Sequence, residues 1–357
     1  MDELDRELLN VIQNDFPMVS APFAELGRRL GTDETDALAR VARLKDEHVI
    51  RQVSAIFDTR ALGYRSSLVA MAVPKDRLER AAELINAHPG VSHNYRRNHE
   101  FNLWFTVAVP YTSDLQAHVD RLHEDAGAIS TRVLQTLRMF KIGVDLDMVG
   151  DRSVTEKTAA NGPDPKYLEA WKRGQAGDPG LSPRDIAIIR ELQEDIEVVP
   201  APFAAMGERL GMTEQEVLDA AQGFVDRGYM RRFAAVLFHR HAGYTANAMA
   251  VWVVPEDKVG EYGPAMAAYR NVSHCYQRPI YEDWPYNLFS MIHGRSKEAC
   301  EEVVQAIAGD TGLTDRAVLY SSKEYKKVRV RYFTDDFYEW EREHLGVDTR
   351  PQLTQPA

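Results

Sequence analysis

The chain has 357 residues, 44% of them hydrophobic, which is enough for two or more domains with sizeable cores. Its formal net charge is −11, so the chain lacks the excess of basic residues that is typical of nucleic-acid-binding proteins. Two cysteines, Cys275 and Cys300, are too few for a disulfide framework, and no apolar run reaches the roughly 18–20 residues of a membrane helix. The charged start of the chain does not resemble a signal peptide, so we expect a cytoplasmic protein without a membrane segment.

The sequence contains an internal duplication. Residues 21–31 read APFAELGRRLG, and residues 201–211 read APFAAMGERLG. The pair Gly63-Tyr64 recurs as Gly243-Tyr244 at the same offset of 180 positions. A repeat of this length is too long for a solenoid unit and indicates two homologous halves.

Each half opens with three segments of helical periodicity. Apolar residues recur at helical spacing over residues 4–12 and 186–192, and again in the two segments that follow. Gly31 is expected to end the second helix as a C-cap, and Thr32 or Asp33 to cap the third helix. Three short helices joined by tight turns predict a helix-turn-helix domain in each half.

The rest of each half alternates between strand and helix patterns. The first half is predicted to form a strand at 66–73, a helix at 75–88, a hairpin at 91–97 and 101–109, a helix at 112–126 and an extended segment at 131–142. The second half repeats this order at 246–254, 258–269, 272–278, 286–293, 297–308 and 317–332, and a helix follows at 335–344. The βαββαβ order predicts a ferredoxin-like sheet domain, so the fold class is α+β.

The sequence thus predicts a tandem duplication whose halves pack as an intramolecular pseudo-dimer. Helix-turn-helix domains are placed at 1–60 and 184–240, ferredoxin-like domains at 61–146 and 241–340, a Gly- and Pro-rich linker at 147–183 and a tail at 341–357. One helix is expected in the linker near 167–173. Association of further copies of the chain stays open.

One motif is repeated inside both predicted hairpins. The first copy reads VSHNYRR and the second VSHCYQR, and each is followed by an Asn-Leu pair between aromatic residues. Alternate strand residues share a face, and ionisable groups repeated on such a face indicate a functional site. The side chains predicted to share a face are His93, Tyr95 and Arg97 in the first half and His274, Tyr276 and Arg278 in the second.

A helix-turn-helix domain followed by a βαββαβ sheet is similar to the Lrp/AsnC family of regulators. The hairpin sequences HNYRR and FNLWFT resemble the siroheme decarboxylases, and the chain resembles their fused two-half form over nearly its whole length. This resemblance implies removal of CO2 from the C12 and C18 acetate side chains of siroheme. The product would be 12,18-didecarboxysiroheme, for haem or haem d1. The resemblance implies no cofactor beyond the iron of siroheme, and the acidic net charge predicts no nucleic-acid partner.

The two histidines of the motif are the predicted catalytic residues. A lone histidine on a strand is usually structural, but His93 and His274 occupy equivalent positions, each beside a tyrosine and an arginine. Loss of CO2 from an acetate arm leaves a carbanion-like carbon, and histidine suits its protonation near neutral pH. Imidazole also ligates haem iron, so either histidine could instead bind the iron of the substrate. The sequence leaves both roles open.

Arginines are expected to bind the carboxylates of this polyanionic substrate, because a guanidinium offers two parallel hydrogen bonds to a carboxylate. Arg96, Arg97 and Arg278 are the candidates in the hairpins, together with Tyr95 and Tyr276 as neighbouring substrate-binding residues.

A basic segment near the C-terminus offers further candidates. Lys327, Arg329 and Arg331 alternate with apolar or aromatic residues, which predicts a strand with one basic face reaching over a bound anion. The first half has Val144 in place of Arg329, so one productive cavity is expected rather than two.

Three more substrate-binding candidates are Asn102, Trp104 and Asn287. They alternate with apolar residues and are predicted on the sheet face opposite those apolar side chains. Trp104 could stack on a macrocycle, and packing in the core is an equal alternative. His99 lies in the hairpin break as a weaker candidate. Cys275 is expected to be a packing residue, since nothing nearby completes a zinc site.

Two other functions are weighed against the enzyme. An Lrp/AsnC-like regulator would bind DNA through its third helix, but the predicted recognition helices begin with acidic residues that repel phosphate. Arg40, Arg43 and Lys45 soften this repulsion in the first half only. A tetrapyrrole carrier would share the site but would release no CO2.

Overall fold

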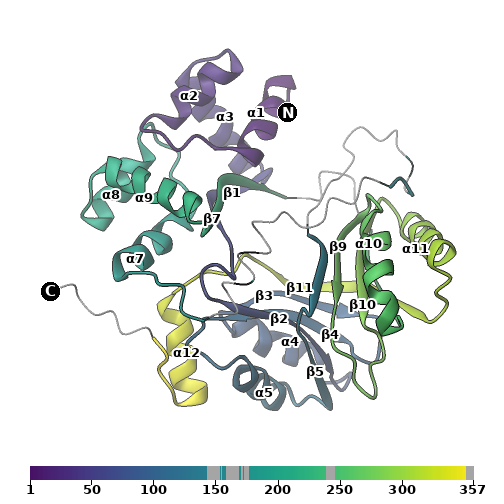
Figure 1. The fold of residues 1–357 in the computed structure, drawn as a ribbon. Coiled ribbons are helices and arrows are strands. Elements are labelled where there is room, and N and C mark those ends of the chain that lie inside the picture. The colour runs from purple at the N-terminus through teal and green to yellow at the C-terminus, as the bar shows by residue number, and fades with distance from the viewer. Residues whose placement is uncertain are drawn as a thin grey trace.

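The computed structural model describes residues 1–142, 177–238 and 246–350, together with residues 153, 155–157, 169 and 172. Most of the predicted linker, all of its expected helix near 167–173 except residues 169 and 172, and the Gly243-Tyr244 pair lie outside these residues. Figure 1 shows the two helix-turn-helix domains gathered at one end of the molecule and a large sheet at the other. Among the described residues no helix has the length and apolar character needed to cross a bilayer.

The predicted helices of both helix-turn-helix domains are present. They are α1 (Glu3–Asn14), α2 (Pro22–Leu30) and α3 (Glu34–Asp46) in the first half, and α7 (Pro183–Leu192), α8 (Pro202–Leu210) and α9 (Glu214–Asp226) in the second. Gly31 ends α2 with φ of 73°, a left-handed conformation that favours glycine. Asp33 caps α3 by accepting a hydrogen bond from the Asp36 amide. Each domain continues into one strand, β1 (Ile50–Phe57) or β7 (Met230–Leu237), and the two strands pair antiparallel.

The remaining strands form one nine-stranded sheet in the order β5-β2-β4-β3-β11-β8-β10-β9-β6. The first half contributes β2 (Arg65–Ala72), α4 (Leu78–Ala87), β3 (Val91–Arg97), β4 (Leu103–Val109), α5 (Leu115–Ala126), β5 (Ser130–Leu134) and β6 (Arg138–Ile142). The second contributes β8 (Ala246–Trp252), the 3₁₀ helix η2 (Glu256–Lys258), α10 (Val259–Ala267), β9 (Val272–Gln277), β10 (Leu288–Gly294), α11 (Lys297–Thr311), β11 (Arg316–Lys327) and α12 (Asp335–Leu345).

The two halves exchange strands, which the sequence pattern did not predict. The extended segment at 131–142 is divided into β5, which pairs with β2, and β6, which crosses to β9 of the second half. In return, β11 pairs first with β8 and then, from Ser321 onward, with β3 of the first half. The halves therefore form one continuous sheet and are joined by backbone hydrogen bonds.

Two further expectations need correction. The predicted strand at 317–332 ends at Lys327, and residues 328–332 follow as irregular backbone. The tail predicted from residue 341 begins later, because α12 continues to Leu345 and buries Glu341 completely. Glu341 accepts a hydrogen bond from His118 Nε2 of α5 at 2.9 Å, which ties α12 to the first half.

Helices cover one face of the sheet, which leaves the other face for a site. Val69 and Phe105 point into a core shared with α4, α5 and α12, while a matching core joins β8, β9 and β10 to α10 and α11. Their strand neighbours Leu68 and Thr106 point to the opposite face, toward β1. This inner face lies toward the β1–β7 ribbon in Figure 1.

Candidate active site

A cavity of about 730 Å³ lies between β1 and the inner face of the sheet. Its walls come from β1 and the loop after it, from β2, β3 and β4, from β6, β7 and β9, and from residues 193–195 and 328–332. Both His93 and His274 line it. The two copies of the motif thus meet in one cavity formed by both halves, and its volume lies within the usual range of ligand sites, roughly 300–1,000 Å³.

Each histidine is held by the serine that precedes it. Ser92 Oγ lies 2.9 Å from His93 Nδ1, and Ser273 Oγ lies 2.7 Å from His274 Nδ1. With Nδ1 occupied in this way, Nε2 is the ring nitrogen left for a ligand in the cavity. A free Nε2 can accept a proton, donate one or bind a metal.

Burial favours the neutral form of both imidazoles. It lowers the pKa of His93 to about 4, with Lys327 and Arg51 adding positive charge nearby. It also lowers the pKa of His274 to about 4, and there the added positive groups include His293, Arg278 and His93 itself. A bound polyanion would oppose this effect, because negative charge favours the protonated ring.

These depressed pKa values predict a loss of stability in mild acid. A histidine whose pKa is about 4 in the folded protein and 6.5 in the unfolded chain binds more protons when unfolded, at any pH between these limits. We therefore expect the free energy of unfolding to fall as the pH is lowered from about 6.5 to about 4. Urea titrations at several pH values check this. The double variant His93→Gln with His274→Gln should show a smaller decrease, and an identical decrease would contradict the assignment.

The tyrosines of the motif lie beside their histidines, as the strand spacing predicts. The ring centroids of His93 and Tyr95 are 6.2 Å apart, and those of His274 and Tyr276 are 5.9 Å apart. Tyr276 lines the cavity, whereas Tyr95 does not. Burial raises the pKa of both phenols, that of Tyr95 to about 12, so both carry a proton at neutral pH.

The motif arginines join the two halves. Arg97 Nη1 donates to the carbonyl of Leu319 in β11 at 2.9 Å, and Arg278 Nη1 donates to the equivalent carbonyl of Leu134 in β5. Burial lowers the pKa of both guanidinium groups to about 10. Arg278 also lines the cavity, so it is placed to contact a ligand.

Two of the predicted carboxylate-binding arginines therefore need correction. Arg97 is 5% exposed and packs against the rings of Tyr95 and Trp104, away from the cavity. Arg96 points to the opposite side of β3 and is exposed to solvent. Strand alternation correctly placed Arg97 on the same face as His93. However, the Arg97 guanidinium bonds to the Leu319 carbonyl of the second half and not to a ligand in the cavity.

Asn102 and Asn287 are structural residues, not substrate-binding ones. The Asn102 side chain accepts from the Val73 amide at 3.0 Å and donates to the Val73 carbonyl at 2.8 Å. Asn287 makes the same two bonds to Val254, at 2.9 and 2.8 Å. Each amide thus replaces a peptide group at the end of the neighbouring strand, which satisfies backbone groups that would otherwise be unpaired.

Trp104 is also a core residue. It is 1% exposed, its indole nitrogen donates to the Phe101 carbonyl at 2.6 Å, and its ring packs on Trp284. No face of this ring is left for a macrocycle. His99 packs on Phe101 and Trp284 beside the same cluster and does not line the cavity.

Cys275 is fully buried, and burial raises the pKa of its thiol to about 12, as expected of a packing residue. Over residues 1–142, 177–238 and 246–350, no group of three or more His, Cys, Asp or Glu side chains is arranged to hold a metal ion.

The basic C-terminal segment reaches the cavity only beyond the end of β11. Lys327, the last residue of β11, pairs with His93 but does not line the cavity. Arg329 and Arg331 both line it. Burial lowers the pKa of Arg329 to about 10, whereas Arg331 is half-exposed and forms an ion pair with Glu194.

Sequence reasoning missed three arginines on the helix-turn-helix side of the cavity. Arg51 donates to the Lys327 carbonyl at 2.7 Å, Arg231 pairs with Asp58 at 2.7 Å, and Arg60 is placed near Tyr276. Arg231 follows Arg51 at the repeat offset of 180 positions, which was a usable signal. The cavity lining carries three carboxylates and twice as many cations, namely Arg51, Arg60, Arg231, Arg278, Arg329 and Arg331. An acidic chain thus has a basic cavity.

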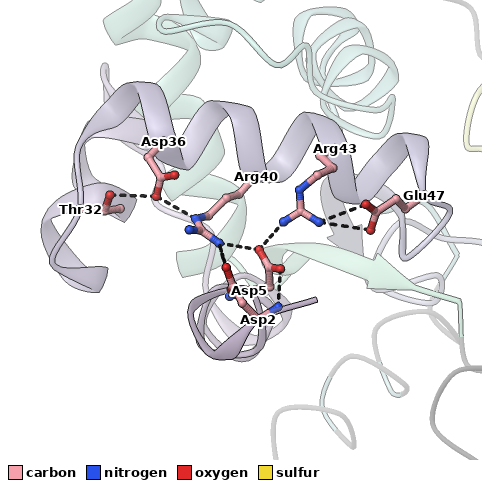
Figure 2. A network of polar contacts seen from close by, with 7 residues as sticks. All are labelled: Asp2, Asp5, Thr32, Asp36, Arg40, Arg43 and Glu47. Atoms are coloured by element: carbon pink, nitrogen blue, oxygen red, sulfur yellow. Dashed lines mark hydrogen bonds and ion pairs between the residues drawn. The ribbon is translucent and has the colours of Figure 1, made fainter.

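The arginines that could have contacted DNA are occupied within the first helix-turn-helix domain. Figure 2 shows Arg40 bonded to Asp2, Asp5 and Asp36, at 2.7–3.0 Å. In the same network Arg43 is bonded to Asp5 at 2.6 Å and to Glu47 at 3.1 Å. These pairs bind α1 to α3 and neutralise both cations, which does not favour the regulator interpretation.

This network predicts a stability effect. Asp5 is 1% exposed, and although burial raises its pKa, hydrogen bonds from Arg43, the Asp2 amide and Arg40 lower that pKa to about 2. Asp5→Ala is expected to lower the free energy of unfolding by about 2 kcal/mol, because charge-assisted hydrogen bonds are lost. Urea unfolding measures this. Asp15→Ala, which removes one exposed pair with Arg29, should cost under about 0.5 kcal/mol, and equal losses would contradict the prediction.

Comparison with known proteins agrees with this architecture. Residues 5–51 and 185–231 match the siroheme decarboxylase NirDL-like HTH domain, and residues 61–141 and 241–326 match the AsnC-like ligand binding domain. The siroheme decarboxylase of Hydrogenobacter thermophilus is 39% identical over 347 residues, covering 97% of this chain and 99% of that protein.

Shorter relatives and solved structures give the same result. The siroheme decarboxylase beta subunit of Methanosarcina barkeri is 43% identical over 147 residues, which is 41% of this chain and 97% of the subunit. Crystal structures of the siroheme decarboxylase NirDL, alone and with an iron-uroporphyrin III analogue, superpose with a TM-score of 0.74 at 34% identity, covering 96% of this chain and 99% of theirs. The chain therefore belongs to the siroheme decarboxylase family, in the form that carries both halves in one polypeptide.

Proposed function

We propose that this chain removes CO2 from the C12 and C18 acetate side chains of siroheme and forms 12,18-didecarboxysiroheme, for haem or haem d1, as a carboxy-lyase. One observation carries the proposal: both duplicated histidines and six arginines line a single cavity of an otherwise acidic protein. Siroheme is an iron tetrapyrrole with carboxylate side chains, so its binding needs cations around a large apolar plane. The iron-uroporphyrin analogue bound by the related NirDL has the same character.

The chemical step needs a binding group for carboxylates and a proton donor. Arg278 is buried and Arg329 is partly buried in the lining, and burial disfavours their charged forms. A carboxylate bound beside them would favour the charged forms again. When the C–C bond breaks, CO2 leaves and the electron pair stays on the methylene carbon. That carbon takes one proton and becomes a methyl group. His93 and His274 each offer Nε2 for the transfer, and either one could bind the iron of the substrate instead.

The reaction is proposed to need no cofactor beyond the iron of siroheme. Removing loosely bound metals with a chelator should therefore leave the rate unchanged. We also place the protein in the cytoplasm, where its two free, buried thiols would stay reduced.

Anaerobic incubation with siroheme, followed by mass spectrometry, tests the proposed function. The native protein should convert siroheme to the singly and then the doubly decarboxylated product. A shifted absorption band with unchanged mass would identify a carrier. Unchanged siroheme together with salt-dependent duplex binding would support the regulator.

A further inference from the structure

A chain of hydrogen bonds leads from His274 away from the cavity. Ser273 Oγ lies 2.7 Å from His274 Nδ1 and also 2.7 Å from His293 Nε2. His293 Nδ1 lies 2.6 Å from Asn247 Oδ1. His274 lines the cavity, whereas Ser273, His293 and Asn247 do not. Through Ser273, His274 in the cavity wall is thus connected to His293, a second and partly exposed histidine on β10.

The partners determine where the protons lie. An amide oxygen can only accept, so His293 Nδ1 carries a hydrogen that it donates to Asn247 Oδ1. The Ser273 hydroxyl also lies 3.3 Å from the Met291 carbonyl, but its contacts with the two imidazoles are shorter, at 2.7 Å. In neutral His293, Nε2 then accepts from the Ser273 hydroxyl, whose oxygen accepts from His274 Nδ1–H. This arrangement leaves His274 Nε2 without a proton. If His293 takes up a proton at Nε2, the serine hydroxyl reverses and donates to His274 Nδ1. The single proton of neutral His274 then moves, by exchange with water, from Nδ1 to Nε2, where it faces the cavity.

The first half has only the beginning of this chain. Ser92 contacts His93 as Ser273 contacts His274, at 2.9 Å. In the second half His293 pairs with Asn247 across β10 and β8, and the corresponding pair across β4 and β2 is Ala108 with Ser66. Ala108 and Ser66 are small and line the cavity. The structure therefore distinguishes the two histidines, although the motifs around them are nearly the same.

We propose that Ser273 and His293 form a proton relay to His274, and that His274 is the residue that protonates the carbon left by departing CO2. This proposal rests on the proposed function. The carbon takes the proton of His274 Nε2, the Ser273 hydroxyl proton moves to His274 Nδ1, and the proton on His293 Nε2 moves to Ser273. His293 then regains a proton from water. Asn247 is a positioning residue that holds the His293 ring in the required orientation.

Several charged groups face this chain and enter any pH profile. Arg278, directly after β9, and Lys141 on β6 add positive charge near His274, as does His93 on β3 when it is protonated. Lys141 is itself held by the Tyr269 carbonyl at 2.8 Å. A polyanionic substrate would offset these charges in the occupied cavity.

Four variants test the relay with siroheme as the substrate under anaerobic conditions. Ser273→Ala and His293→Ala should lower kcat about 10- to 100-fold with KM changed less than about threefold, since acid–base groups contribute on the order of 10²–10⁴. His293→Gln can keep a hydrogen bond to each neighbour but cannot take up a proton. Its kcat should therefore fall as much as that of His293→Ala, while the variant stays folded. Ser92→Ala, the matched change in the first half, should lower kcat less and leave the pH profile of kcat in its native form.

Two further readouts separate a relay from a merely structural role. Added imidazole should restore activity to His293→Ala, where the ring has left space, but not to Ser273→Ala. Ring ¹⁵N spectra of the native protein should show hydrogen on His274 Nδ1, and this preference should weaken in Ser273→Ala. Native kcat and pH profile in His293→Ala and His293→Gln would overturn the relay, as would equal losses in Ser92→Ala and Ser273→Ala. Absence of CO2 release from the native protein would instead overturn the proposed function.

Discussion

His274→Ala is expected to slow CO2 release from siroheme at least about 100-fold, and His93→Ala is expected to do so by a similar factor. Both rings line the cavity: His274 is the proposed proton donor, and His93 is a candidate for proton transfer to the other acetate carbon or for binding the iron. Rapid-quench sampling followed by mass spectrometry gives the rate of each decarboxylation. Accumulation of a singly decarboxylated product in one variant would show which step that histidine serves.

The matched control is His123→Ala. His123 lies on α5, contacts Thr131 at 2.8 Å and does not line the cavity. Its loss should leave the rate unchanged. Native rates in both His93→Ala and His274→Ala would contradict the assignment of the active site, whatever their effect on stability.

Arg329→Glu is expected to weaken siroheme binding at least about 100-fold, which corresponds to about 2.8 kcal/mol. The Arg329 guanidinium lines the cavity and is largely desolvated, since burial lowers its pKa to about 10. A carboxylate in its place would repel the carboxylates of the substrate in a medium that screens charge poorly. Titration of the siroheme absorption band at low ionic strength measures the effect.

Arg80→Glu provides the control for charge alone. Arg80 is exposed on α4, outside the cavity lining, and its replacement changes the net charge by the same amount. It should alter binding less than about threefold, because an exposed charge is screened by solvent and salt. Similar losses in the two variants would show that overall charge governs binding, and that Arg329 has no specific contact.

Much of the fold could be predicted because its signals are local. Gly31 and Asp33 determine helix ends through the conformation and hydrogen bonds of a few neighbouring residues. The exchange of β6 and β11 could not be predicted in this way. A strand sequence shows which of its faces is buried, but the residues that it pairs with come from the other half of the chain.

The candidate site could be predicted only in part, because strand alternation is a local signal and side-chain contacts are not. Strand alternation placed His93 with Tyr95, and His274 with Tyr276, on shared faces. It could not show what each side chain contacts, so Asn102 and Arg97 were assigned to a ligand although they bind backbone carbonyls. The sheet face on which a side chain lies follows from the local sequence. The groups that the side chain contacts depend on segments distant in the sequence.

The asymmetry between the halves is visible in the sequence only after the structure aligns them. Ala108 and His293 occupy matching positions on β4 and β10. They do not obey the repeat offset of 180 positions, because the hairpin loop of the second half is longer. The motifs themselves are almost the same, so the difference in proton supply comes from residues outside them. Duplication thus provides two histidines, and divergence at a neighbouring strand distinguishes their roles.

The most direct test of the central claim is a single turnover of limiting siroheme by the native protein in deuterium oxide under anaerobic conditions. If the chain decarboxylates both acetates and protonates the resulting carbons from exchangeable groups, the product will have lost two molecules of CO2 and gained one non-exchangeable deuterium in each new methyl group. Siroheme recovered with its mass unchanged, from protein shown by absorption to have bound it, would contradict the claim.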